Sequence, residues 1–82
     1  MIIIWDRPKR IANIEKHGLD FADLTIDFFL DAIIRPAKKE RLQAVGYLGN
    51  AQVSVIFVKR GSEGWSIISM RPANPKERTL LS

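Results

Sequence analysis

The chain has 82 residues, of which 46% are hydrophobic and 27% are charged, and it contains no cysteine. This length allows one domain over residues 1–82 with a single core, and the lack of cysteine excludes disulfide and thiolate sites, so a reducing cytoplasm is expected. The formal net charge of +4 favours a polyanion or an acidic protein partner, and no apolar run is long enough for a membrane span or a signal peptide.

The first elements expected along the chain are a strand and a helix. Ile2–Trp5 is a short apolar run that is typical of a buried strand. Asp6 fits a helix N-cap, Pro8 fits the first turn and Gly18 fits the residue after the last turn, so a helix is predicted between them. Apolar residues at helical spacing over 21–30 predict a second helix.

The rest of the chain alternates in the manner of strands. Strands are predicted over 32–35, 41–48, 52–59 and 65–70, joined by a charged turn at 36–40, a Gly49-Asn50 hairpin turn and a glycine-containing turn at 61–64. Asn74-Pro75-Lys76-Glu77 has the pattern of a capping box and predicts a terminal helix. That helix is too short to be stable alone, so a partner or this sheet must cover it. The element order predicts an α+β fold.

The predicted helix after Asp6 carries a polar surface of mixed chemistry. At about 100° per residue, Lys9, Asn13 and Lys16 fall nearly in line. Asp6, Arg10 and His17 lie beside that line, within roughly a third of the circumference. Ile11 and Ile14 fall on the other flank, so we expect them to face the core.

This polar surface suggests two kinds of chemistry. His17, the single histidine, suits proton transfer near neutral pH, although a cation in the last helical turn also interacts well with the helix dipole. Lys9 and Lys16 can neutralise phosphates, and the Asn13 amide can bind a base edge or a ribose hydroxyl. Arg10 lies beside them on the same candidate RNA-binding surface. A merely solvated helix face is the alternative.

Three further candidates lie in the second half of the chain. Arg60 and Arg71 end neighbouring predicted strands, and a hairpin would place them at its opposite ends. Arg71 precedes Pro72, so its guanidinium is expected at a sheet margin with little packing value, where it either binds phosphate or only aids solubility. Glu77 is either the helix cap or a catalytic base. No metal-ligand cluster and no glycine-rich phosphate loop is visible.

Two motifs stand near opposite ends of the chain. The first is W-D-x-x-K-x-x-x-N-x-x-K-H-G-x-x-F over residues 5–21, and the second is I-S-x-R-x-A-x-x-x-E-R over residues 68–78. Together they resemble the BrnT family of small bacterial toxins. The chain departs from the usual family pattern at Phe57-Val58, where a His- or Tyr-Thr pair is common, and at Pro72 within the second motif.

The resemblance implies a type II toxin, which is a metal-independent ribonuclease without a cofactor that inhibits translation. It implies a BrnA-like ribbon-helix-helix antitoxin as partner, an RNA substrate, and operator DNA bound only through the antitoxin complex. It further implies an antiparallel sheet with helices on one face, similar to RelE-like toxins. The expected reaction is attack of a ribose 2′-hydroxyl on the adjacent phosphate.

The residues expected to carry catalysis are His17, Lys16, Arg60, Arg71 and Glu77. The residues expected to bind RNA are Lys9, Arg10, Asn13 and Arg78. No metal-binding residues are expected. A non-catalytic basic module that holds a protein or nucleic acid without turnover is the alternative.

Overall fold

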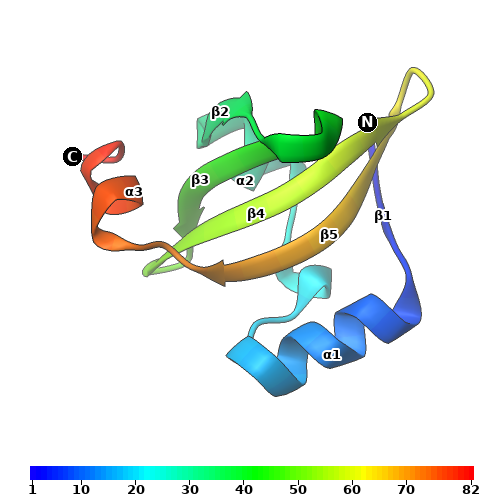
Figure 1. Cartoon of the computed structure of the whole chain (residues 1–82), viewed down its shortest axis with the longest axis horizontal. Coiled ribbons are helices and arrows are strands. Elements are labelled where there is room, and N and C mark those ends of the chain that lie inside the picture. Colours follow the sequence, from blue (N-terminus) through cyan, green and yellow to red (C-terminus); the bar gives the residue numbers. More distant parts are fainter.

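The computed structural model describes residues 1–82, and its framework is one five-stranded sheet (Figure 1). In chain order the elements are β1 (Ile2–Trp5), α1 (Arg7–His17), a 3₁₀ turn (Phe21–Asp23), α2 (Ile26–Asp31), β2 (Ile33–Pro36), a second 3₁₀ turn (Lys38–Glu40), β3 (Leu42–Leu48), β4 (Ala51–Arg60), β5 (Gly64–Pro72) and α3 (Pro75–Thr79). The α+β class, the strands and the hairpin turn are therefore as expected.

The sheet is mixed rather than purely antiparallel. Its strand order is β1-β5-β4-β3-β2, and neighbours among β2 to β5 run antiparallel. β1 pairs with β5 in parallel, with Ile2 opposite Gly64 and Trp5 opposite Ile67. The expectation of an antiparallel sheet was wrong at this edge, because no short turn joins β1 to its neighbour and so no local signal fixes its direction.

The predicted helix over 21–30 is divided into a 3₁₀ turn and α2. Asp20 Oδ1 accepts a hydrogen bond from the Ala22 N–H at 2.9 Å and caps the 3₁₀ turn. Thr25 Oγ1 accepts one from the Phe28 N–H at 3.5 Å and starts α2. Because two capping side chains stand five residues apart, the backbone is extended at Leu24, between the two elements.

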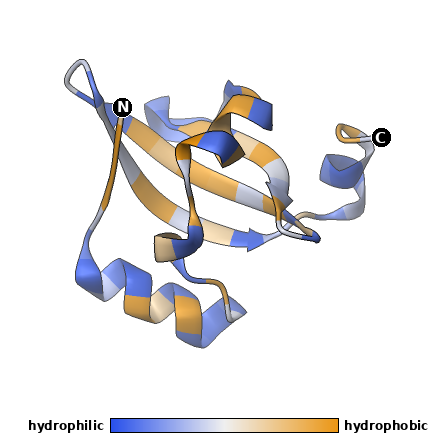
Figure 2. Ribbon diagram, turned by 180° about the vertical axis from the view of Figure 1, so that it is seen from behind, coloured by the Kyte–Doolittle hydropathy of each residue, from blue (hydrophilic) through white to orange (hydrophobic).

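One face of the sheet carries the hydrophobic core. Side chains from alternate positions of β3, β4 and β5 pack against the 3₁₀ turn and α2 on this face, which Figure 2 shows from behind. The buried cluster consists of Phe21, Leu24, Phe28, Phe29, Ala44, Val53, Val55, Phe57, Ile67 and Met70. Phe29 meets Phe57 and Trp65 edge-on, with ring centroids 5.2 and 5.1 Å apart, which fixes α2 on the sheet.

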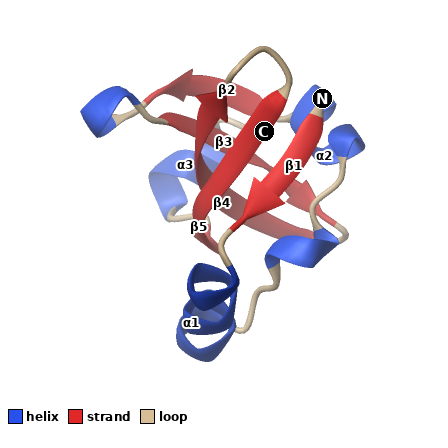
Figure 3. Cartoon of the chain, turned by 90° about the vertical axis from the view of Figure 1, so that its right-hand side faces the viewer, coloured by secondary structure: helices blue, strands red, loops and turns tan.

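The helices do not all lie on that face. α3 lies on the opposite face, where its Glu77 bonds to Gln43 and Arg71, and Figure 3 shows α2 and α3 on opposite sides of the sheet. α1 runs along the sheet edge below β5 (Figure 1). The expectation of helices on one face was therefore wrong for α1 and α3. No helix is both long and apolar enough to cross a membrane.

The orientation of α1 also differs from the expectation. Ile11 and Ile14 are 45% and 38% exposed, whereas Asn13 is only 6% exposed. β1 ends at Trp5, which leaves the following part of β5 without a strand neighbour, and α1 lies there instead. Because the helix meets a backbone edge rather than an apolar surface, a hydrogen-bonding side chain is buried in place of isoleucine.

Candidate functional site

A hollow of about 200 Å³ lies between α1 and β5, and it collects most of the polar surface predicted for the helix. Its lining residues are Lys9, Ala12, Asn13, Lys16, His17, Ile68 and Ser69. We call it the α1–β5 hollow. It brings together two cations and the single histidine, as the helical spacing predicted, and it adds the hydroxyl of Ser69 from the sheet.

Asn13 has a structural role beneath this hollow. Its Oδ1 accepts a hydrogen bond from the Met70 N–H at 3.0 Å, and its Nδ2 donates one to the Leu19 carbonyl at 3.0 Å. The side chain thereby pairs a backbone N–H of β5 beyond the end of β1. It also pairs a backbone carbonyl in the loop after α1. Both amide groups are used within the protein, so the expected contact of Asn13 with RNA does not fit this geometry.

Two cations on α1, Arg10 and Lys9, have acidic partners. Arg10 binds Asp20 through Nε–Oδ1 at 2.7 Å and Nη2–Oδ2 at 2.9 Å. The Arg10 guanidinium, helped by the Ala22 N–H, lowers the pKa of Asp20 to about 2. Arg10 thus joins α1 to the 3₁₀ turn, which is a structural role beside the expected RNA contact. Lys9 Nζ lies 2.9 Å from Asp6 Oδ2. Because both side chains of this pair are exposed, it holds Lys9 in place much more weakly than Asp20 holds Arg10.

A β-bulge shapes the sheet side of the hollow. The register between β4 and β5 shifts between Ile56 and Phe57, so that Ile56 faces Ser69 while Phe57 faces Ile67. Ile68 is therefore the extra residue, and it lines the hollow beside Ser69. Bulges are frequent next to active sites because they redirect the following side chain. Here the bulge places Ser69 on the face opposite the core.

A second and larger hollow lies on that same face. It has a volume of about 600 Å³ and is lined by Arg35, Pro36, Ala37, Lys38, Arg41, Gln43, Ile56 and Arg71. We call it the basic hollow. Its four cations come from β2, from the connection between β2 and β3, and from β5. Sequence analysis treated the connection only as a charged turn, although Arg35, Lys38, Lys39 and Arg41 form a dense cationic run.

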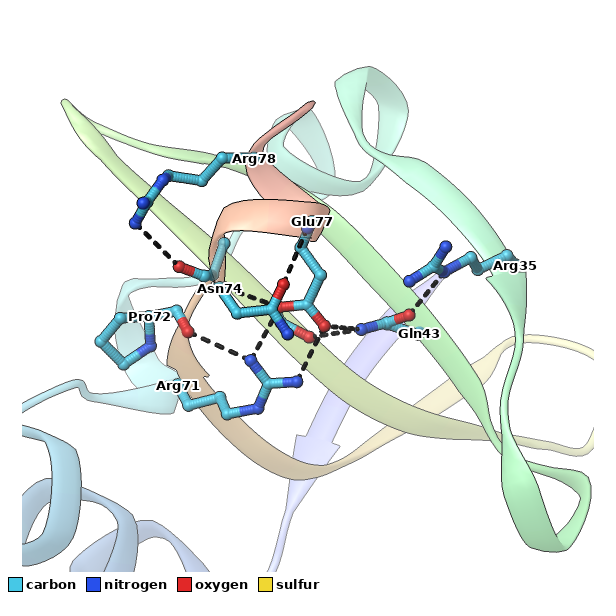
Figure 4. A network of polar contacts seen from close by, with 9 residues as sticks. Arg35, Gln43, Arg71, Pro72, Asn74, Glu77 and Arg78 are labelled. Carbon is cyan, nitrogen blue, oxygen red and sulfur yellow. Dashed lines mark hydrogen bonds and ion pairs between the residues drawn. The ribbon is translucent and has the colours of Figure 1, made fainter. Parts of the chain in front are cut away.

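A buried polar network holds two of these arginines (Figure 4). Glu77 accepts hydrogen bonds from Arg71 Nη1 and Nη2 at 2.7 and 2.8 Å. Gln43 Nε2 donates to Glu77 Oε2 at 2.7 Å and to Ser54 Oγ at 2.8 Å. Gln43 Oε1 accepts from Arg35 Nε at 2.7 Å. One buried amide therefore connects the guanidiniums on the two sides of the basic hollow.

Glu77 is a cap and an anchor rather than a base. Its carboxylate accepts from the Asn74 N–H at 2.9 Å, and its own N–H donates to Asn74 Oδ1 at 2.8 Å, which completes the expected capping box. The residue is only 4% exposed. Arg71 above all, together with Asn74 and Gln43, lowers the pKa of Glu77 to about 2. A carboxylate with so low a pKa and so many partners is a poor proton acceptor, so the geometry favours the cap over the catalytic base.

Arg71 is more constrained than a strand-end arginine was expected to be. Its side chain is 40% exposed, and besides Glu77 it donates from Nη1 to the Pro72 carbonyl at 3.2 Å. A guanidinium has five N–H groups. The two that make no hydrogen bond within the protein, on Nε and Nη2, form one side of the planar fork, which suits an oxyanion. The expectation of little structural value was wrong, whereas a role in phosphate binding fits.

Arg60 and Arg78 are not brought to either hollow. Arg60 lies at the far end of the β4–β5 hairpin, opposite Gly64, whereas Arg71 lies opposite Ser54. Six residues of β4 separate the two positions, which corresponds to about 20 Å along a strand. Arg78 donates to the Ala73 carbonyl at 3.3 Å and points away from Arg71 in Figure 4. The expected participation of both residues in the site is therefore not supported by their positions.

Comparison with known proteins identifies the family. The model of the ribonuclease toxin BrnT of type II toxin–antitoxin systems matches residues 5–77. The chain belongs to the BrnT family. It is 56% identical to the Brucella abortus ribonuclease toxin BrnT, whose crystal structure superposes with a TM-score of 0.86 over 90% of this chain and 97% of that one. Curated proteins give no match.

Family membership gives the chain its activity and its general partner. It is a ribonuclease toxin of a type II toxin–antitoxin system, and an antitoxin is its partner. The enzymatic interpretation of the two motifs is confirmed over the alternative of a non-catalytic binding module. In the structure, no three His, Cys, Asp or Glu side chains are grouped as a metal site would require.

Proposed function

We propose that RNA cleavage takes place at the α1–β5 hollow by attack of a ribose 2′-hydroxyl on the adjacent phosphate. The observation that carries the proposal is the convergence of Lys9, Lys16 and His17 with Ser69 in one hollow. Lysine side chains supply the positive charge that a pentavalent phosphorane requires, and histidine supplies a proton-transfer group. All chemical roles in this mechanism are filled by side chains of the chain itself.

Arg71 supports the same site from the neighbouring strand position. Ser69 and Arg71 alternate with Met70 on β5 and therefore lie on the same face of the sheet, about 7 Å apart along the strand. The two Arg71 N–H groups that make no hydrogen bond within the protein, on Nε and Nη2, can bind the non-bridging oxygens of the attacked or the next phosphate. His17 and Lys16 share the proton transfers in this proposal, without separate assignment of base and acid.

Cleavage of a short RNA by the purified toxin in EDTA tests this mechanism. We expect cleavage to persist and to leave a 2′,3′-cyclic phosphate or 3′-phosphate end. His17→Gln should reduce the rate at least about 100-fold, because general acid–base groups contribute that much or more. Glu15→Gln, an exposed change on the same helix, is the matched control and should leave the rate unchanged. Products with 3′-hydroxyl ends, or a fully active His17→Gln, would refute the mechanism.

For the partner, we propose a BrnA-like ribbon-helix-helix antitoxin, with both proteins in the cytoplasm. Membership of a type II toxin–antitoxin family supports a protein antitoxin. In this proposal operator DNA is bound by the antitoxin within the complex, and the toxin alone has no operator affinity. Gel-shift measurements with antitoxin, toxin and complex test this, and operator binding by the toxin alone would contradict it.

A further inference from the structure

Apart from Arg71, the basic hollow is unexplained by the proposed cleavage site. Arg35, Lys38, Arg41 and Arg71 meet there, and the one acidic side chain bonded to any of them is Glu77, which binds Arg71. Three positive charges therefore remain in excess within one hollow of about 600 Å³. Gathering like charges costs free energy unless an anion offsets it, so such a cluster is more than a solubilising surface requires.

Two of the four cations are also held in place. Arg35 is oriented by Gln43 and Arg71 by Glu77, and both acceptors are buried. Lys38 and Arg41 are presented by a connection in which Lys39 and Glu40 have φ angles of 58° and 61°. Non-glycine residues rarely adopt such angles. Pre-oriented cations are typical of a binding site, because less side-chain entropy is lost when the ligand binds.

The two hollows lie on one continuous face of the sheet. Ser69, Ile56, Gln43 and Arg35 are successive partners across β5, β4, β3 and β2. Residues paired in this way point to the same face. Three strand spacings of about 4.8 Å separate Ser69 from Arg35, so these two ends of the row are roughly 14 Å apart. This distance corresponds to about four nucleotides of a stacked strand, at 3.4 Å each.

The opposite side of the molecule repels a polyanion. Asp23, Asp27 and Asp31 line a further hollow beside the 3₁₀ turn and α2, on the face that covers the core. These three carboxylates lie on the side of the sheet opposite the basic hollow. A negatively charged strand is drawn toward the face that carries both the α1–β5 hollow and the basic hollow.

We propose that the basic hollow binds the phosphodiester backbone of the RNA substrate a few nucleotides from the cleaved bond. The RNA then crosses this face of the sheet beside α3, from α1 to the β2–β3 connection. This inference rests on the proposed function, because the path of the RNA starts from the proposed cleavage site. Its cationic contacts are with phosphates, so they hold the RNA without reading its sequence.

Binding of a fluorescent 2′-O-methyl RNA octamer to the purified toxin tests the inference. The blocked 2′-hydroxyls prevent cleavage, so affinity is measured whether or not the proposed reaction is correct. The informative variant is Lys38→Gln/Arg41→Gln, because neither side chain makes a hydrogen bond within the protein and both line the hollow. Lys39→Gln is the matched control, since it removes the same charge from the same connection outside the hollow.

We expect the double variant to bind about tenfold more weakly, with the slope of log affinity against log salt reduced by about 1.4 for two lost phosphates. Lys39→Gln should bind as the wild type does, and circular dichroism should be unchanged for both. Equal affinities for all three proteins would overturn the inference, as would an equal loss in the control. Normal RNA binding by a double variant that no longer binds antitoxin would also overturn it, and would assign the hollow to the antitoxin.

The same measurement separates this inference from the cleavage mechanism. Octamer binding by Lys38→Gln/Arg41→Gln is measured without any cleavage, whereas His17→Gln is tested by its loss of cleavage of ordinary RNA. If the cleavage mechanism is wrong, the octamer affinities are unaffected. If the basic hollow does not bind RNA, the cleavage result for His17→Gln is unaffected.

Discussion

Replacing Glu77 by glutamine removes the charge at the centre of the network while nearly keeping the shape of the side chain. The carboxylate accepts four hydrogen bonds, two from Arg71 and one each from Gln43 and Asn74. All four partners are donors, and a glutamine amide turns an NH₂ group toward some of them. The substitution therefore loses charge-assisted hydrogen bonds and leaves buried donors unpaired.

The size of the loss follows from the pKa of Glu77. Its pKa falls from an ordinary 4.5 to about 2 on folding. A shift of about 2.5 units corresponds to about 3 kcal/mol of stability at pH 7. The group is 4% exposed, so little of this is screened on its own side, although its partner Arg71 is 40% exposed. We expect Glu77→Gln to unfold about 2–3 kcal/mol more easily, which lowers Tm by roughly 10–20 °C for a domain of this size.

The pH dependence gives the sharper test. Because the folded pKa lies below the unfolded one, the stabilisation is complete above pH 4.5 and is lost as the pH falls toward 2. Urea unfolding followed by circular dichroism should show a gap between wild type and Glu77→Gln that shrinks by about 2 kcal/mol between pH 7 and pH 3. Glu63→Gln, an exposed change in the turn before β5, should stay within about 0.5 kcal/mol of wild type. A gap independent of pH would refute the electrostatic explanation.

Two further substitutions test how the elements are joined, both by urea unfolding. Asn13→Ala should lose about 2–3 kcal/mol, because it leaves a β5 amide and a loop carbonyl unpaired, whereas the exposed Glu15→Ala should lose little; equal losses would contradict a structural Asn13. Gly46→Ala should lose about 1–3 kcal/mol of unfolding free energy, because its Cβ would lie 3.0 Å from Phe28 Cε1 in the core. An unchanged stability would mean that α2 shifts at little cost in free energy.

The sequence predicted those parts of the fold that depend on neighbours along the chain. Pro8 and Gly18 marked the ends of α1, with Gly18 at a φ of 70°, and Gly49 began the hairpin turn at a φ of 61°. The face of α1 was misjudged, because hydrophobic periodicity assumes an apolar surface beneath a helix. Asn13 instead meets an open strand edge, which is formed by residues more than 50 positions away.

The candidate site was predicted in part for the same reason. Lys9, Lys16 and His17 come from one helix, so their spacing alone brought them together. The basic hollow was missed because Arg71 joins the β2–β3 connection only through β3 and β4, a pairing that no local pattern fixes. Glu77 was ambiguous, since a capping box explains it from sequence and its contact with Arg71 depends on the tertiary fold.

Because the Glu77–Arg71 ion pair stabilises the fold, loss-of-function variants are of two kinds with opposite effects on a cell. One kind destabilises the domain, and the other kind leaves it folded. A change in the network weakens the whole domain, so the toxin is degraded and its antitoxin is released. Under the proposed mechanism, a change at His17 leaves a folded, inactive toxin that still occupies antitoxin. We expect a cell that carries the second kind to be the more sensitive to an active copy of the same toxin, because part of its antitoxin is already bound.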